Sequence, residues 1–252
     1  MRSLIILCFL ASLSVIAADT KDRLRINDND WPPYFFGGKE GSPKGLGKEL
    51  LHHCLLSNGY DFTFSFYPIN RMHKYMASGI LDINVYSYKP ERGGYLLYNS
   101  EPLFTAGYRP VVRVNEKRKI QHLADFDPLL LGHLHGLRYS DEFYQYVMAR
   151  EERGELVTAS DSNTLLTLLN HNRIDVFVSI TESVRWTAKS MGLINKIKLL
   201  DYDVKTAEYF VTISKQSPRI KDKVEFLNSI DACLVAIKQN GLYNEIVERY
   251  KL

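Results

Sequence analysis

His133 and His135 have the spacing in this chain that comes closest to a metal-binding motif. Alternate residues of a strand point to one face, so a metal carrier is one candidate function for this pair. No third ligand follows at a suitable spacing, and we therefore predict no metal and no cofactor. The sequence also lacks the Gly-x-Ser-x-Gly elbow, the His-Glu-x-x-His helix and the glycine-rich phosphate loop. We expect a protein that is not an enzyme.

Cys54 and Cys233 are the cysteines that lie beyond the N-terminal apolar segment, and they have neither a redox spacing nor a metal-ligand spacing. In an oxidising compartment they could form a disulfide. We expect instead that each is a separately buried thiol on a helix.

The N-terminus predicts export. A positive charge at Arg2 precedes an apolar run from Leu4 to Leu13, and Val15-Ile16-Ala17-Ala18 has the small residues that signal peptidase requires. We interpret residues 1–18 as a cleaved signal peptide and expect a periplasmic protein, with an uncleaved anchor as the alternative.

Composition excludes some partners and favours others. With a formal net charge of only +3 and no extended run of charge, the sequence shows no electrostatic footprint for nucleic acid, and we expect no nucleic-acid partner. Tyrosine (16 residues) outnumbers phenylalanine (12 residues), and a tyrosine ring with its polar tip suits a wet binding cleft. We therefore expect a small-molecule ligand.

Strand and helix patterns alternate along the rest of the chain and predict an α/β fold. They form a first β-α-β-α-β unit, a second similar unit, and a C-terminal part too small to bury its own core, in which Ser217-Pro218 opens a long helix. The chain must then cross twice between two lobes. Each lobe is expected to have a mostly parallel sheet flanked by helices. The expected parts are lobe 1 at 22–107 plus 209–252, lobe 2 at 108–208, and crossing segments near 105–112 and 204–210.

A series of short segments, in their order and spacing, resembles family 3 of the extracellular solute-binding proteins, which serves polar amino acid uptake. The segments are Trp31-Pro32-Pro33-Tyr34, Gly79-Ile80-Leu81-Asp82, Lys89-Pro90-Glu91-Arg92, Asn99-Ser100-Glu101-Pro102, His171-Asn172-Arg173-Ile174-Asp175 and Asn240-Gly241-Leu242-Tyr243-Asn244-Glu245-Ile246. The resemblance implies the type II periplasmic binding fold, in which two α/β lobes on a two-stranded hinge close on a ligand.

The resemblance also implies where the ligand binds. Arg92 matches the arginine that holds the ligand carboxylate through its planar fork of donors. Trp31 matches the aromatic residue that packs on the ligand side chain. The full set of expected ligand-binding residues is Asp28, Trp31, Tyr34, Tyr67, Arg71, Tyr86, Ser87, Arg92, His135, Arg138, Tyr139 and Thr181.

One position departs from the family pattern. Binders of α-amino acids place an aspartate after a second-lobe strand to hold the ligand ammonium, whereas this chain has Ser179-Ile180-Thr181 there. A buried ammonium without a partner is costly. An ordinary α-amino acid is therefore expected as ligand only if Asp28, Asp30 or Glu182 takes that role.

The sequence thus predicts a monomeric periplasmic protein that captures a small polar, carboxylate-bearing solute, an amino acid or a related compound, for a membrane permease of an ABC transporter. Two alternatives stay open. One is a periplasmic enzyme of the same fold, such as a dehydratase. The other is a ligand-sensing module for a membrane signalling partner.

Overall fold

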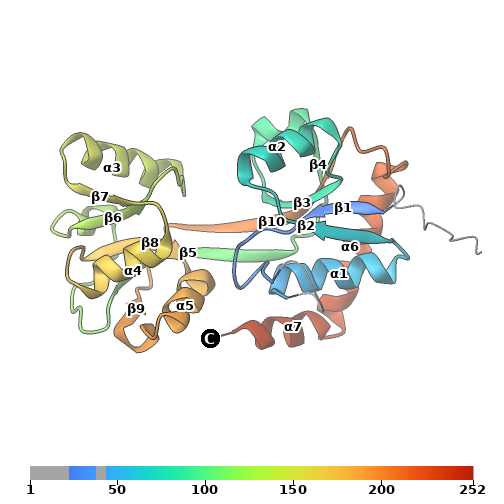
Figure 1. Cartoon of the computed structure of the whole chain (residues 1–252). Helices are drawn as coiled ribbons and strands as arrows, with labels where there is room; N and C mark the ends of the chain where they lie inside the picture. The colour runs from blue at the N-terminus through green and yellow to red at the C-terminus, as the bar shows by residue number, and fades with distance from the viewer. Residues whose placement is uncertain (1–22, 38–43, 252) are drawn as a thin grey trace, which may run out of the picture.

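The computed structural model describes residues 23–37 and 44–251, so the expected signal peptide lies outside the described residues. Figure 1 shows two lobes connected by two long strands, β5 (Phe104–Arg113) and β10 (Lys205–Ser214). Within the described residues, strand pairing runs in the order β2-β1-β3-β10-β5-β8-β6-β7, with β4 also paired to β10 and β9 to β5. The sheet therefore continues from one lobe into the other.

Lobe 1 has helices on both faces of its sheet. The parallel strands β2 and β3 flank β1, and β10 runs antiparallel to β3. One apolar core contains residues of α1, α6 and α7, while a second lies under α2. The elements of this lobe are β1 (Leu24–Asn27), α1 (Leu46–Ser57), β2 (Phe62–Ser65), α2 (Ile69–Ser78), β3 (Ile83–Ser87), the short 3-10 helix η1 (Pro90–Gly94), β4 (Leu96–Tyr98), α6 (Lys223–Gln239) and α7 (Leu242–Tyr250).

Lobe 2 repeats this plan. Its parallel strands β7, β6 and β8 are joined to β5, which runs antiparallel to β8. One core packs under α3 and another under α4 and α5. The elements are η2 (Leu123–Phe126), β6 (Leu131–Leu134), α3 (Asp141–Glu152), β7 (Leu156–Ala159), α4 (Ser162–Asn170), β8 (Val176–Ile180), α5 (Thr181–Ser190), η3 (Ile194–Lys196) and β9 (Ile197–Leu199).

Tyr108 marks the point where β5 passes from one lobe to the other. Residues 104–108 of β5 pair with β10, and residues 108–112 pair with β8. The segments that the sequence suggested as crossings, near 105–112 and 204–210, fall largely within β5 and β10. The hydroxyls of Tyr108 and Tyr209 lie 2.9 Å apart, so the two connecting strands are tied together at this point.

The α/β fold class predicted from the sequence is confirmed, and α2 ends at Gly79. This glycine has φ +74°, and a Cβ there would lie 2.2 Å from the carbonyl oxygen of Gln216. One expected boundary is wrong: α6 begins at Lys223 with Asp222 as its N-cap, not at Ser217. The Ser217 hydroxyl instead donates to the buried carboxylate of Asp82 at 2.5 Å, which holds this segment against β3.

The expectation of two separate thiols is also wrong. Cys54 on α1 and Cys233 on α6 form a disulfide, with their Cα atoms 5.6 Å apart. The two helices pack side by side in the core of lobe 1, which brings the cysteines together although 179 positions separate them in the sequence.

Replacing both cysteines with serine is expected to lower the free energy of unfolding by about 2–4 kcal/mol, because the cross-link restricts the unfolded chain over a long loop. For a protein of this size the melting temperature falls by about 5–15 °C. Differential scanning calorimetry of the double variant and of the oxidised protein measures the difference. Equal melting temperatures, or two free thiols titratable in the native oxidised protein, would contradict the disulfide.

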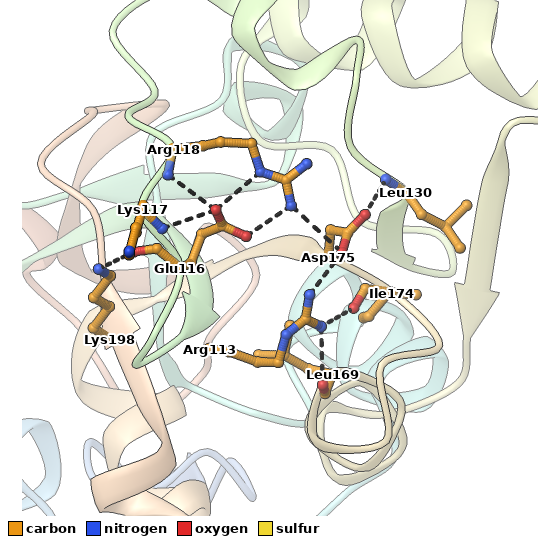
Figure 2. A network of polar contacts seen from close by, with 9 residues as sticks. All are labelled: Arg113, Glu116, Lys117, Arg118, Leu130, Leu169, Ile174, Asp175 and Lys198. Carbon is orange, nitrogen blue, oxygen red and sulfur yellow. Dashed lines mark hydrogen bonds and ion pairs between the residues drawn. The ribbon is translucent and has the colours of Figure 1, made fainter.

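A polar network holds the end of lobe 2 that lies away from lobe 1 (Figure 2). Arg113 donates to the carbonyl oxygens of Leu169 and Ile174 and to the carboxylate of Asp175, at 3.2, 2.6 and 2.7 Å. Glu116 accepts hydrogen bonds from the guanidinium and the backbone N–H of Arg118. The Arg118 guanidinium is the largest cause that lowers the pKa of Glu116 to about 2.

Glu116→Gln is expected to reduce stability above pH 4.5, the ordinary pKa of the carboxyl group, and to have less effect as the pH falls toward 2. The sign follows from linkage: a carboxyl group whose pKa is lower in the folded state stabilises the fold while it is ionised, and protonation removes that contribution. Urea unfolding of both proteins between pH 7 and pH 3 tests this. A difference that grows on acidification has the opposite sign and would contradict it.

Across residues 23–37 and 44–251, no helix is both long enough and apolar enough to cross a membrane.

Candidate functional site

A cavity of about 570 Å³ lies between the two lobes. Lobe 1 contributes residues that end or follow β1, β2 and β3, and lobe 2 contributes residues that end or follow β6 and β8. In open α/β sheets the carboxyl ends of parallel strands form the usual ligand crevice. Here the parallel strands of both lobes direct those ends into the same space, and the tyrosines of the connecting strands, Tyr108 and Tyr209, line it as well.

Arg92 brings a positive charge into this cavity. Its Cζ lies 4.5 Å from the centre of the Tyr86 ring, and its Nη1 donates to the carbonyl oxygen of Ser87 at 3.0 Å. These two contacts fix the plane of the guanidinium. A planar guanidinium held in place has further N–H donors with which to bind a carboxylate through two parallel hydrogen bonds.

Five of the expected binding residues line the cavity: Trp31, Tyr67, Tyr86, Arg92 and Tyr139. They come from both lobes, with Tyr139 in lobe 2. Tyr139 is buried, its hydroxyl donates to the carbonyl oxygen of Val178 at 2.9 Å, and burial raises its pKa. The structure thus places Tyr139 and Arg92 at one space between the lobes.

Tyr34 lies outside the cavity lining and connects the two lobes beside it. Its hydroxyl donates to Glu182 Oε2 at 2.8 Å, and burial, followed by the charge of Glu182, raises the pKa of Tyr34. Trp31 Nε1 donates to the hydroxyl of Ser183 at 3.0 Å. Residues 31–34 of lobe 1 are therefore attached to the start of α5 in lobe 2.

Asp28 is buried within lobe 1, directly after β1, and forms an ion pair with Lys48 at 2.8 Å. The two side chains are 2% and 7% exposed, so the carboxylate of Asp28 is enclosed by protein. Ser87 contributes its carbonyl oxygen to Arg92 and is not itself part of the lining. Thr181 donates to the carbonyl oxygen of Gly107 at 3.3 Å and likewise lies outside the lining.

The other three expected residues are exposed and do not line the cavity. Arg138 forms an ion pair with Asp141 at 3.2 Å and lies over the ring of Tyr144. His135 follows β6 with its side chain in solvent, and Arg71 lies on the exposed side of α2. The sequence placed His135 and Arg138 near the ligand by the resemblance of their segment to the family, and Arg71 by its position at the start of a helix.

Several lining residues were missed, among them Tyr108 and Tyr209 on the connecting strands and His73 on α2. A signal for the two tyrosines was present, because both lie in or beside the predicted crossings. His73 Nδ1 lies 3.2 Å from the hydroxyl of Tyr86, and burial lowers the pKa of the imidazole.

The two histidines considered as metal ligands are placed differently. His133 is buried, and its Nε2 donates to the carbonyl oxygen of Leu137 at 3.1 Å, whereas His135 is exposed. The part of the chain that the structure describes contains no group of three or more histidine, cysteine, aspartate or glutamate residues that could hold a metal ion.

The sequence from residue 26 to residue 252 matches the model of a protein family, the bacterial extracellular solute-binding proteins, family 3. This chain is a family 3 solute-binding protein. The match extends over both lobes and so confirms the resemblance on which the expected site was based. The comparison with curated proteins gives no match.

Solved structures share the fold of this family 3 protein at low sequence identity. An ancestral cationic amino acid solute-binding protein has a TM-score of 0.71 and 20% identity, and the match covers 92% of this chain and 96% of that one. The second substrate-binding domain of a putative amino acid ABC transporter from Streptococcus pneumoniae has a TM-score of 0.69 and 16% identity, with 91% and 100% covered. A histidine kinase sensor domain has a TM-score of 0.68 and 17% identity, with 91% and 96% covered. At such identities the likeness is one of fold.

Proposed function

We propose that this protein captures a small, carboxylate-bearing solute in the cavity between its lobes and performs no chemistry on it. One observation carries the proposal: Arg92, held by Tyr86 and Ser87, presents a guanidinium inside a cavity lined by both lobes. A solute enclosed there loses its hydration shell, so its negative charge needs a matched donor. Arg92 is that donor.

The proposed mechanism is closure of the lobes on the solute. The solute binds first to lobe 1 through Arg92 and the ring of Trp31, and lobe 2 then brings Tyr139 against it. β5 and β10 act as the hinge, because they are the strands that run between the lobes. Contacts that form only in the closed state move the open–closed equilibrium toward closure.

Thermal melting in the presence of a panel of solutes tests this proposal. Amino acids, dicarboxylates and simple organic acids are added in turn, and a ligand at about 100 times its Kd is expected to add about 2.7 kcal/mol of stability. Amines without a carboxyl group serve as the comparison set. If no carboxylate raises the melting temperature while an amine does, the charge assignment of the site is wrong.

We also propose that the protein acts in the periplasm as a monomer and delivers its solute to the permease of an ABC transporter. The family description is extracellular, and one structural neighbour is a substrate-binding domain of a putative amino acid ABC transporter. Uptake of a radiolabelled ligand by cells with and without the gene measures delivery. Unchanged uptake would contradict it.

A second candidate function is ligand sensing for a membrane signalling partner, and the fold of a histidine kinase sensor domain favours it. In both functions the solute binds between the lobes, so binding data alone do not separate them. Deletion of the gene separates the two functions. Loss of a transporter component changes solute uptake, whereas loss of a sensor changes the solute-dependent phosphorylation of a kinase. Turnover of the bound solute, followed by NMR, would instead favour an enzyme of the same fold.

A further inference from the structure

The rings of the cavity lining present apolar faces, because most of their polar tips are bonded to protein atoms. The hydroxyls of Tyr108 and Tyr209 bond to each other, and the hydroxyl of Tyr139 donates to a carbonyl oxygen. The hydroxyl of Tyr86 lies 3.2 Å from His73 Nδ1, and the indole N–H of Trp31 donates to Ser183. A ligand between these rings therefore meets ring faces rather than free hydroxyls.

The same apolar character extends to the outer part of the cavity. Phe66 and Ile69 in lobe 1 and Leu137 in lobe 2 line the cavity although they are 55%, 70% and 40% exposed. Large apolar side chains that remain this exposed beside a cavity gain burial when an apolar group covers them. Ligand binding supplies such a group.

The acidic groups that could hold a ligand ammonium are either bonded to other protein groups or exposed to solvent. Asp28 is buried in its ion pair with Lys48, and Glu182 accepts the hydroxyl of Tyr34. Asp30 lines the cavity but is exposed, and an ion pair with an exposed carboxylate contributes little in water. Within the described lining, no buried carboxylate faces the cavity.

A cationic ligand body is also disfavoured by Arg92 itself. The guanidinium already covers the ring of Tyr86 at 4.5 Å, so a cation–π contact at that ring is taken.

Building on the proposed function, we propose that the solute is an organic acid with an uncharged aromatic or aliphatic body and no α-ammonium group. Its carboxylate binds Arg92, and its body lies among the rings of Trp31 and Tyr139 toward Phe66, Ile69 and Leu137. The site discriminates against ligands with an α-ammonium group because Asp28 is enclosed in its ion pair and Glu182 is bonded to Tyr34, so neither carboxylate is available to that group.

Matched pairs of ligands test the ligand class. Isothermal titration calorimetry compares phenylacetate with phenylglycine, 3-phenylpropionate with phenylalanine, and hexanoate with norleucine. In the pair that binds most tightly, the acid is expected to bind at least about tenfold more tightly than the amino acid. N-trimethylated phenylalanine and phenethylamine complete the series and are expected to bind more weakly than the acid.

The possible outcomes separate this inference from the proposed function. If the amino acids bind more tightly than their matched acids, and Asp30→Asn removes this preference, the inference is overturned while carboxylate capture stands. Tightest binding of the trimethylated compound would overturn it in favour of an aromatic cage for a cation. If no carboxylate of any kind binds, the proposed function fails with it.

Ile69→Ser tests the apolar outer part of the cavity. The loss of a side chain that the ligand covers is expected to weaken binding of the best acid about threefold or more. Ile80→Ser is the matched control, because Ile80 is also an exposed isoleucine of lobe 1 but does not line the cavity. Equal affinities of the two variants would show that the ligand body does not reach Ile69.

Discussion

Arg92→Ala is expected to weaken binding of a carboxylate ligand by about 2–4 kcal/mol, which is about 30- to 1000-fold in Kd. The reason is that the ligand charge would then be dehydrated without a partner. In the native protein the guanidinium is held over Tyr86 and by the carbonyl oxygen of Ser87, so little ordering is required when the ligand binds. Isothermal titration calorimetry with the best ligand measures the change.

Arg71→Ala is the matched control for this prediction, because Arg71 was also expected to bind the ligand but is exposed on α2 outside the cavity lining. It is expected to leave the Kd unchanged. Arg92→Lys keeps the charge but loses the planar fork, so its affinity is expected to fall between those of the native protein and Arg92→Ala. Equal losses at Arg71 and Arg92 would indicate long-range attraction rather than a carboxylate site.

Asp28→Ala is expected to lower the free energy of unfolding by about 3–5 kcal/mol, because it leaves the buried ammonium of Lys48 without its partner. Both side chains are almost fully enclosed, at 2% and 7% exposure, so water cannot replace the lost carboxylate. Urea unfolding followed by circular dichroism measures the loss.

Asp30→Ala is the control, since Asp30 is exposed and its removal is expected to change stability by less than about 0.5 kcal/mol. The double variant Asp28→Ala with Lys48→Met removes both charges and is expected to recover part of the stability. If Asp28→Ala is as stable as the native protein but no longer binds ligand, Asp28 is a binding residue and the buried-pair assignment is wrong.

Local patterns in the sequence were sufficient to predict the strands and helices whose residues line the cavity. Alternating strand and helix patterns predicted the β-α-β-α-β unit of lobe 1, and α2 of that unit ends at Gly79, which has positive φ. Arg92 and Tyr86 were placed in the site by a segment match, and the structure brings both to the cavity. Topology places the residues that follow a parallel strand near the crevice, but it does not fix where each side chain points: Tyr139 lines the cavity, whereas His135 is exposed.

Partners distant in the sequence could not be predicted in the same way. Asp28 was expected to bind ligand from the family resemblance, but it forms a buried ion pair with Lys48 from α1. Cys54 meets Cys233 only because α1 and α6 pack together. Tyr34 bonds to Glu182 of the other lobe. In each case the contact depends on how elements distant in the sequence pack against each other, and residue spacing within one segment does not predict that packing.

A crystal structure of the protein with its tightest-binding organic acid tests directly whether Arg92 binds the ligand carboxylate between the lobes. We predict the acid between the lobes, its carboxylate within hydrogen-bonding distance of Arg92 and its body against Trp31 and Tyr139. An acid bound outside this cavity, or an Arg92 side chain turned away from the carboxylate, would contradict it.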